Sequence, residues 1–179
     1  MYDIEVHITE EDEPPAARHE KLGGKPNVTL DRATGIVTKD FPPATRVRDF
    51  NQANDFFVNE QDNDFIVPLI EINHDLVRTR YLSGYETLED FGKANKNDRD
   101  ALNAIREKLY EGFESLNSWY SDLVNPNNIM VKIEKGRPDI KFIEGGKEDF
   151  FPPEVRIQQW RDRSSAVPWL RKPKGWRGK

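Results

Sequence analysis

Cysteine is absent from the sequence, and histidine occurs only three times in 179 residues. Without thiols the chain cannot form disulfides, thiolate zinc sites or cysteine nucleophiles, and such a composition is typical of proteins from a reducing compartment. The histidines at His7, His19 and His74 lie far apart and lack metal-ligand spacing. These absences argue against a zinc hydrolase and favour a cytoplasmic location.

Long apolar runs are also absent. No stretch approaches the roughly 20 apolar residues that a membrane-spanning helix needs, so we expect no membrane span. The N-terminal sequence MYDIEVHITEEDE is acidic, whereas a signal peptide has a basic and then an apolar region. With 36% hydrophobic and 33% charged residues the chain is polar, but 179 residues suffice for one domain that buries a core.

Positive charge is scarce in most of the chain and concentrated at its C-terminal end. From Arg156 onward there are eight Lys or Arg residues and one acid, so the first 155 residues carry a net charge of about −12. The same tail contains Trp160, Trp169 and Trp176. Basic and aromatic residues together can bind nucleic acid, but they can also bind an acidic protein surface, including the body of this chain. We favour the acidic body of this chain, with a protein partner possible through the same tail and nucleic acid as the weaker alternative.

Hydrophobic periodicity predicts an α+β fold. Two adjacent pairs of strands cannot be parallel crossover units, so we expect antiparallel hairpins rather than alternating βαβ units. The expected elements are strands at 2–9, 28–30, 36–39, 64–70, 76–82, 128–134 and 139–145, and helices at 45–60, 86–94, 98–120 and 153–163.

The stretch SDLVNPNNIMV, Ser121–Val131, interrupts this pattern. An acid, a proline and two adjacent asparagines stand directly ahead of an apolar strand. One interpretation is a polar turn, because Asp and Asn side chains bond to nearby backbone. The other is a site in which a carboxylate meets a substrate hydroxyl and an amide holds a metal ion.

The order of motifs resembles a shortened protein-kinase-like fold. Kinase-like catalytic loops read Asp-Leu-x-Pro-x-Asn-Ile and are followed by two strands and an acid-glycine pair. The matching residues here are Asp122, Pro126, Asn128, Ile129, Glu144 and Gly145. Upstream, LGGKPNV stands where a Gly-rich loop would be, and GIVTKDF places Lys39 on a strand. The chain is most similar to small bacterial PhoP-regulatory-network-type kinase-like proteins, and more distantly to RIO-type and lipopolysaccharide-core kinases.

The resemblance implies a role for each candidate residue. Asp122 would be the catalytic carboxylate that orients the attacking hydroxyl and accepts its proton, and Lys39 would contact the ATP phosphates. Gly23 and Gly24 would cradle those phosphates. Either Asp55 or Glu60 would be the helix acid that pairs with Lys39. Mg²⁺ would be held by Asn127 or Asn128 together with Glu144, through the oxygen ligands that this cation prefers.

The resemblance also implies a two-lobe organisation. Residues 1–22 would form an N-terminal strand and acidic loop, 23–83 a small β-rich lobe with one helix, 84–150 a shortened helical lobe, and 151–179 the basic tail. Lys39 from the early hairpin and Glu144 from the late one should then lie on opposite walls of one crevice.

The chain also departs from the kinase pattern. The pair Tyr120-Ser121 replaces the usual His-Arg, the loop after Asp122 is one residue longer, and Glu144 replaces an aspartate with no Phe after it. Two functions follow from the resemblance. The first is an ATP- and magnesium-dependent phosphotransferase or a nucleotide-binding regulator. The second is a catalytically inactive, pseudokinase-type module that binds a protein partner through its basic tail.

Overall fold

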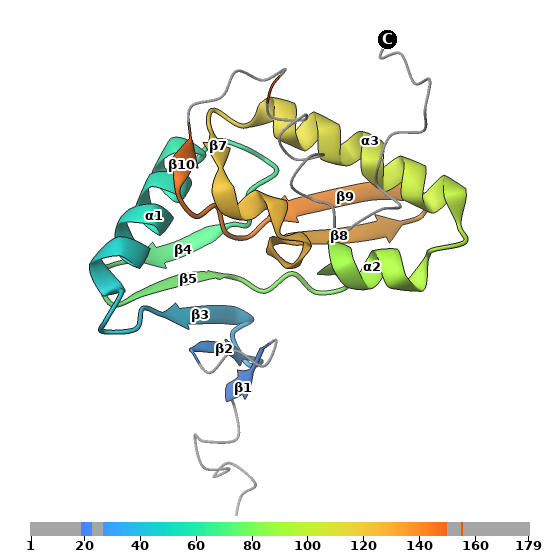
Figure 1. The fold of residues 1–179 in the computed structure, drawn as a ribbon. Coiled ribbons are helices and arrows are strands. Elements are labelled where there is room, and N and C mark those ends of the chain that lie inside the picture. The colour runs from blue at the N-terminus through green and yellow to red at the C-terminus, as the bar shows by residue number, and fades with distance from the viewer. Residues whose placement is uncertain (1–18, 23–26, 150–154, 156–179) are drawn as a thin grey trace, which may run out of the picture.

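The computed structural model describes residues 19–22, 27–149 and 155 (Figure 1). Its first part is a five-stranded antiparallel sheet in the order β1-β2-β3-β5-β4. The strands are β1 (His19–Lys21), β2 (Val28–Asp31), β3 (Ile36–Asp40), β4 (Leu69–Ile72) and β5 (Leu76–Arg80). The predicted α+β class with antiparallel sheets is confirmed.

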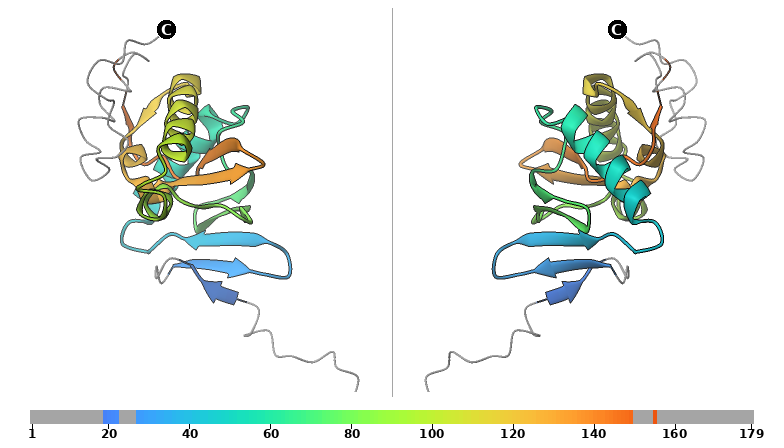
Figure 2. Two further views of the ribbon diagram at one scale, coloured as in Figure 1. Left: turned by 90° about the vertical axis from the view of Figure 1, so that its right-hand side faces the viewer. Right: turned by 90° about the vertical axis from the view of Figure 1, so that its left-hand side faces the viewer.

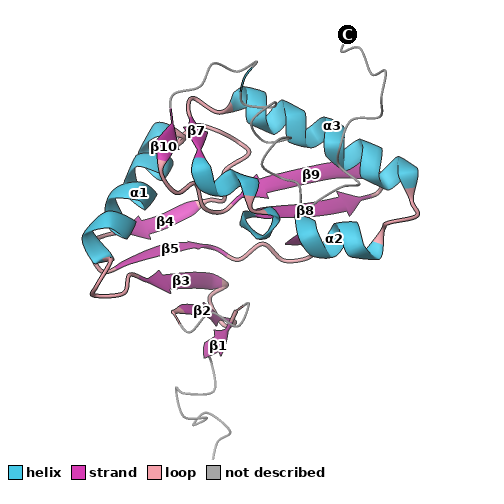
Figure 3. Cartoon of the chain, viewed as in Figure 1, coloured by secondary structure: helices cyan, strands magenta, loops and turns pink. Residues whose placement is uncertain are grey.

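One helix, α1 (Arg46–Asn59), connects β3 to β4. It follows Pro42-Pro43, which cannot continue a strand, and its first turn is tied by a 2.6 Å hydrogen bond from the Thr45 hydroxyl to Asp49. Phe56 and Phe57 are buried and anchor the helix to the core. The helix begins at the loop after β3, and its other end lies next to β10 (Figure 3).

The second part combines two helices with a three-stranded sheet. Helices α2 (Leu88–Ala94) and α3 (Arg99–Ser115) begin at the caps Thr87 and Asp98, whose side chains accept from the backbone N–H of Asp90 and Ala101. The sheet has the order β6-β8-β9, with β6 (Glu86–Thr87), β8 (Ile129–Glu134) and β9 (Arg137–Phe142). The β8–β9 hairpin lies between α3 and the five-stranded sheet (Figure 2).

Short elements complete this part and carry the motif residues. The strand β7 (Trp119–Tyr120) pairs with β10 (Glu148–Asp149), and two 3₁₀ turns, η2 (Ser121–Val124) and η3 (Pro126–Asn128), lead into β8. The two sheets are joined at Phe142, which accepts from the Val67 N–H at 3.0 Å and donates to the Phe65 carbonyl at 2.7 Å. One continuous apolar core results, running from Phe41 to Phe142.

Several expected elements are confirmed and several differ. The hairpin β2–β3, the helix α1, the capped helices α2 and α3 and the hairpin β8–β9 lie where the pattern predicts them. The helix α3 ends at Ser115, because the chain turns at the extended residue Leu116 and continues as β7. The late hairpin turns at Lys135-Gly136, both with positive φ, so Pro138 lies inside β9 rather than in the turn.

The first sheet begins at His19, earlier than the predicted lobe boundary at residue 23, because β1 pairs with β2. The expected strand at 2–9, the expected helix at 153–163 and the basic tail lie outside the described residues. Within the described ranges, the helices are all too short or too polar to cross a bilayer.

Candidate functional site

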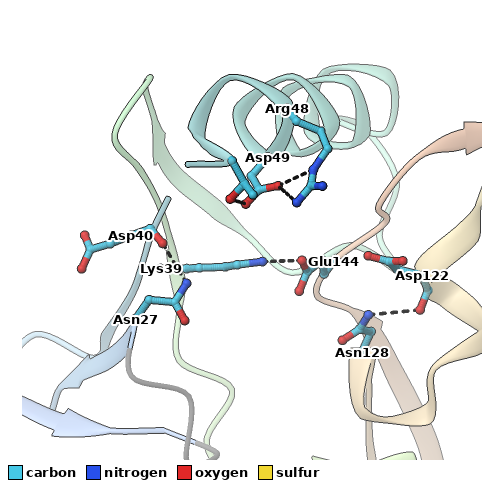
Figure 4. Close-up of polar contacts among 9 residues, drawn as sticks. Asn27, Lys39, Asp40, Arg48, Asp49, Asp122, Asn128 and Glu144 are labelled. Atoms are coloured by element: carbon cyan, nitrogen blue, oxygen red, sulfur yellow. Dashed lines mark hydrogen bonds and ion pairs between the residues drawn. The ribbon is translucent and has the colours of Figure 1, made fainter. Parts of the chain in front are cut away.

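The centre of the candidate site is an ion pair between Lys39 and Glu144, residues 105 positions apart in sequence. Lys39 extends from β3, where its backbone is opposite Val28 on one side and Val77 on the other. Glu144 follows β9, two residues after Phe142. Both side chains are about one-third exposed or less, at 27% and 31%. The predicted juxtaposition of the early and late hairpins is thus confirmed (Figure 4).

Around this pair is a pocket of about 270 Å³. Four separate parts of the chain supply its charged side chains: β3, the first turn of α1, the turn η2 and the segment after β9. Its lining includes Lys39, Phe41, Arg48, Asp49, Gln52, Phe57, Val77, Asp122, Ile143, Glu144, Gly145 and Gly146. Two cations and three carboxylates therefore share one hollow.

A wider and more open groove of about 740 Å³ adjoins this pocket along the start of α1. It shares Arg48 and Gln52 with the pocket and is also bordered by Lys147, which follows the glycines of the site.

Asp122 is held in place by backbone contacts. Its N–H donates to the Gly145 carbonyl at 3.1 Å, and its own carbonyl accepts from the Asn128 side chain at 3.1 Å. Its carboxyl group lies directly against Gly146, where a β-carbon would come closer than 3.0 Å to the carboxyl carbon and both oxygens. Gly146 also has φ +67°, a conformation that other residues adopt only with strain. The glycine is therefore required for Asp122 to occupy this position.

The two asparagines have different surroundings, and this separates the alternatives for a metal ligand. Asn128 is only 4% exposed and its amide points to the Asp122 carbonyl. Asn127 is exposed and donates to Glu89 of α2 at 2.7 Å, away from the pocket. The structure therefore does not bring Asn127 to the pocket, and Asn128 is the amide that contacts Asp122. Asn128 stays the candidate.

The predicted helix acids are also corrected. Asp55 is exposed, and Glu60 is completely buried at the end of α1, where it accepts hydrogen bonds from Asn117 and Ser118 instead of pairing with Lys39. The helix acid that faces Lys39 is Asp49. The sequence carried a signal for it, because Asp49 stands four and seven residues before the inward-facing Ala53 and Phe56, on the apolar face of the helix.

Asp49 is held ionised by its neighbours. Burial alone would raise the pKa of this carboxyl, but hydrogen bonds from Thr45 and Arg48, followed by the positive charges of Arg48 and Lys39, outweigh that effect and lower the pKa below its ordinary value. Arg48 contacts it at 3.0 Å. At neutral pH the pocket therefore presents a negative charge on the α1 side as well as on the Glu144 side.

No three His, Asp or Glu side chains within the described ranges are grouped as a protein-only metal cage. The donor set nevertheless fits Mg²⁺, which usually binds one or two carboxylates and completes its shell with water and substrate phosphates. Glu144 is a carboxylate in the lining of the pocket, and Asn128 lies buried beside Asp122, outside that lining. Gly23 and Gly24 lie outside the described residues, between Leu22 and Asn27.

The comparisons with known proteins support the fold and no finer assignment. No family model matches the chain, and no curated protein matches it. A solved structure described as "Crystal structure of Rad53 kinase domain and SCD2" is similar, with a TM-score of 0.51 and 21% sequence identity. The likeness covers 80% of this chain and 57% of that one, so this chain spans little more than half the length of the structure it matches. The fold is kinase-like, and the bacterial subfamily is not supported by these comparisons.

Proposed function

We propose that the pocket binds the phosphates of ATP together with Mg²⁺ and that the chain is a small kinase-like phosphotransferase, or a regulator that binds nucleotide in the same pocket. The observation that carries the proposal is the convergence of Lys39, Asp49, Asp122 and Glu144 on one hollow. The similarity to a kinase domain supports it, because phosphoryl transfer depends on positioning and charge neutralisation at such a site.

The Lys39–Glu144 ion pair suits a ligand that contains both an anion to bind Lys39 and a cation to bind Glu144. Phosphate oxygens would replace Glu144 as the partner of Lys39, and Glu144 would then be released to hold the cation, with Asn128 as a further oxygen donor. Asp49 would keep the Lys39 ammonium oriented after Glu144 leaves it. Bound Mg²⁺ would supply neutralisation of the phosphate charge.

Asp122 is placed to act on the second substrate. Its carboxylate is fixed against Gly146 at the wall of the pocket, and the open groove shares Arg48 and Gln52 with that pocket. A hydroxyl that arrives through the groove would be oriented by Asp122 and would pass its proton to this carboxylate.

Two observations favour a second candidate, nucleotide or protein binding without turnover. Ser121 stands where the kinase pattern has an arginine, and Glu144 stands where that pattern has an aspartate. In that case the protein partner would be bound through the basic tail, as the sequence predicts. The two candidates share the pocket and differ in whether Asp122 matters.

Two measurements test the proposal: the shift of Tm on addition of Mg-ATP, which reports binding, and the release of ADP, which reports turnover. A ligand at 100 times its dissociation constant stabilises the native state by about 2.7 kcal/mol, which for a chain of this size raises Tm by about 5–11 °C. Lys39→Ala and Glu144→Gln should abolish the shift, and Lys93→Ala, at an exposed pair on α2, should retain it. No shift in the wild type at millimolar Mg-ATP would overturn the proposal. Turnover that survives Asp122→Asn would rule out the role proposed for Asp122, and a thermal shift without any ADP release in the wild type would leave only the second candidate.

A further inference from the structure

A buried carboxylate outside the pocket links α1 to the strand that leads into Asp122. Glu60, directly after the end of α1, has no exposed surface. Buried carboxylates are costly unless they are paired or fully hydrogen-bonded, and within the described ranges no ion pair is formed by this residue. Its burial therefore depends on the hydrogen-bond donors that surround it.

Four groups donate to Glu60. The backbone N–H of Asn117 lies 2.8 Å from one carboxylate oxygen and 3.1 Å from the other, and the N–H of Ser118 is at 3.1 Å. The Tyr120 hydroxyl and the Asn63 amide each approach to 3.1 Å. Every partner donates, so both oxygens act only as acceptors, as they do in an ionised carboxylate. Burial and then the Glu60 charge raise the pKa of the Tyr120 phenol, which keeps its donor proton.

These donors belong to the segment that delivers the site. Asn117 and Ser118 lie between α3 and β7, and Tyr120 directly precedes the turn that carries Asp122. The Tyr120 ring packs edge-on against Phe56 at 5.0 Å, and Gly145 fits so closely between the two rings that a β-carbon there would come within 3.0 Å of both. Tyr120, a hydrogen-bond donor to Glu60, therefore also packs against the backbone at Gly145.

The other end of the same helix reaches the pocket. Asp49, in the first turn of α1, lies beside Lys39, whereas Glu60 ends the helix against the strand before Asp122. One 14-residue helix therefore spans the distance between the phosphate side of the pocket and the segment that supplies the acid. Its length and its two anchors determine how far apart those sides lie.

We propose that Glu60 is a positioning residue for the site, a buried carboxylate that locks the end of α1 to the segment 117–120 and thereby sets Asp122 against the Lys39–Glu144 pair. The role of Glu60 in catalysis rests on the proposed function, but the structural coupling between Glu60 and Asp122 can be measured without nucleotide. A residue that only stabilised the fold would act on all parts of the core alike.

Hydrogen exchange of individual amides in the full chain tests the coupling. The informative protons are those of Ser121 and Asp122, which bond to the carbonyls of Lys147 and Gly145 at 2.9 and 3.1 Å. Amides of Leu109 in α3 and Val77 in β5 report the rest of the core. The variant is Glu60→Gln, which replaces one acceptor oxygen by an NH₂ group facing N–H donors. The control is Glu114→Gln, the same change on the exposed face of α3.

We expect exchange at Ser121 and Asp122 to accelerate by about tenfold or more in Glu60→Gln, because hydrogen bonds to a buried charge are lost. Leu109 and Val77 should change far less, and Glu114→Gln should alter none of them. An equal acceleration at all four amides would overturn the proposal, since Glu60 would then stabilise the whole fold and nothing more. Unchanged exchange at Asp122 would overturn it as well.

A second variant covers the case in which Glu60→Gln does not fold. Tyr120→Phe removes one donor to Glu60 and keeps the ring against Phe56, so the same local pattern should appear with a smaller factor. Failure of the proposed function is recognised separately, by the absence of any Mg-ATP thermal shift in the wild type. If the shift is present, Glu60→Gln should lose ATP turnover while keeping its affinity for Mg-ATP.

Discussion

The contact between Gly146 and the Asp122 carboxyl gives the sharpest test of the site. Gly146→Ala imposes two separable costs: a β-carbon in a left-handed backbone conformation, and a collision with the Asp122 carboxyl. Gly136, in the turn of the late hairpin, has φ +76° and nothing within 4 Å of an added β-carbon. Gly136→Ala therefore carries the first cost without the second and serves as the matched control.

The magnitudes follow from these two geometries. A left-handed conformation costs a residue other than glycine about 1–2 kcal/mol, which in a chain of this length lowers Tm by about 2–8 °C in both variants. In Gly146→Ala the carboxyl of Asp122 must also rotate away, and an off-rotamer side chain costs about 0.5–1.5 kcal/mol. The two variants should thus differ little in stability. They should differ greatly in turnover, because a displaced general base costs about 10²–10⁴-fold.

The assays are thermal unfolding, ATP turnover and the ¹³C shift of the Asp122 carboxyl. Turnover should be lost in Gly146→Ala and kept in Gly136→Ala, and the Asp122 shift should move only in Gly146→Ala. Equal turnover in the two variants, with an unmoved Asp122 signal, would refute the reasoning that Gly146 positions this acid.

Three further predictions follow from the site. Lys39→Ala should lower the free energy of unfolding, measured by denaturant titration, by less than about 1 kcal/mol, because partly exposed ion pairs contribute little. The same variant should lose the thermal shift with Mg-ATP, which Lys93→Ala should keep. The pKa of Asp49 lies below its ordinary value of 3.8, so this carboxyl stabilises the fold above that pH and loses its contribution as pH falls through the lowered pKa. Asp49→Asn should therefore reduce the loss of unfolding free energy that is measured between pH 6 and 2. An unchanged pH dependence in this range would contradict the prediction. Asn128→Ala should destabilise by about 1 kcal/mol or more in a denaturant titration and Asn127→Ala by much less, since only the first side chain is buried.

The sequence contained enough local information for most of the fold. Thr87 and Asp98 cap their helices as their residue types predict, and the apolar stripe of α3 is buried at Ile105 and Leu109. The two-residue strands β6, β7 and β10 were not predicted, because two residues carry no periodicity and their pairing depends on distant partners.

The part of the site that depends on the order of motifs along the chain was predictable. Lys39, Asp122 and Glu144 meet in one pocket because the two hairpins face each other, as the resemblance implied. The helix acid was not predictable from order alone. Asp55 stands six residues after Asp49, which places it on another face of α1, whereas Glu60 stands eleven residues after Asp49, on nearly the same face but about three turns away. Only the packing of the helix decides which face and which end of α1 meet Lys39.

The seam at Phe142 constrains how a ligand can enter. The backbone of this residue bonds to Phe65 and Val67 at 2.7 and 3.0 Å, and the chain reaches Glu144 two residues later. A rigid separation of the five-stranded sheet from the β8–β9 hairpin would break both hydrogen bonds each time a ligand bound. We therefore expect a ligand to enter by local adjustment of the side chains that line the pocket. On the proposed function, the association rate of Mg-ATP should then not be limited by a rigid movement of one sheet relative to the other.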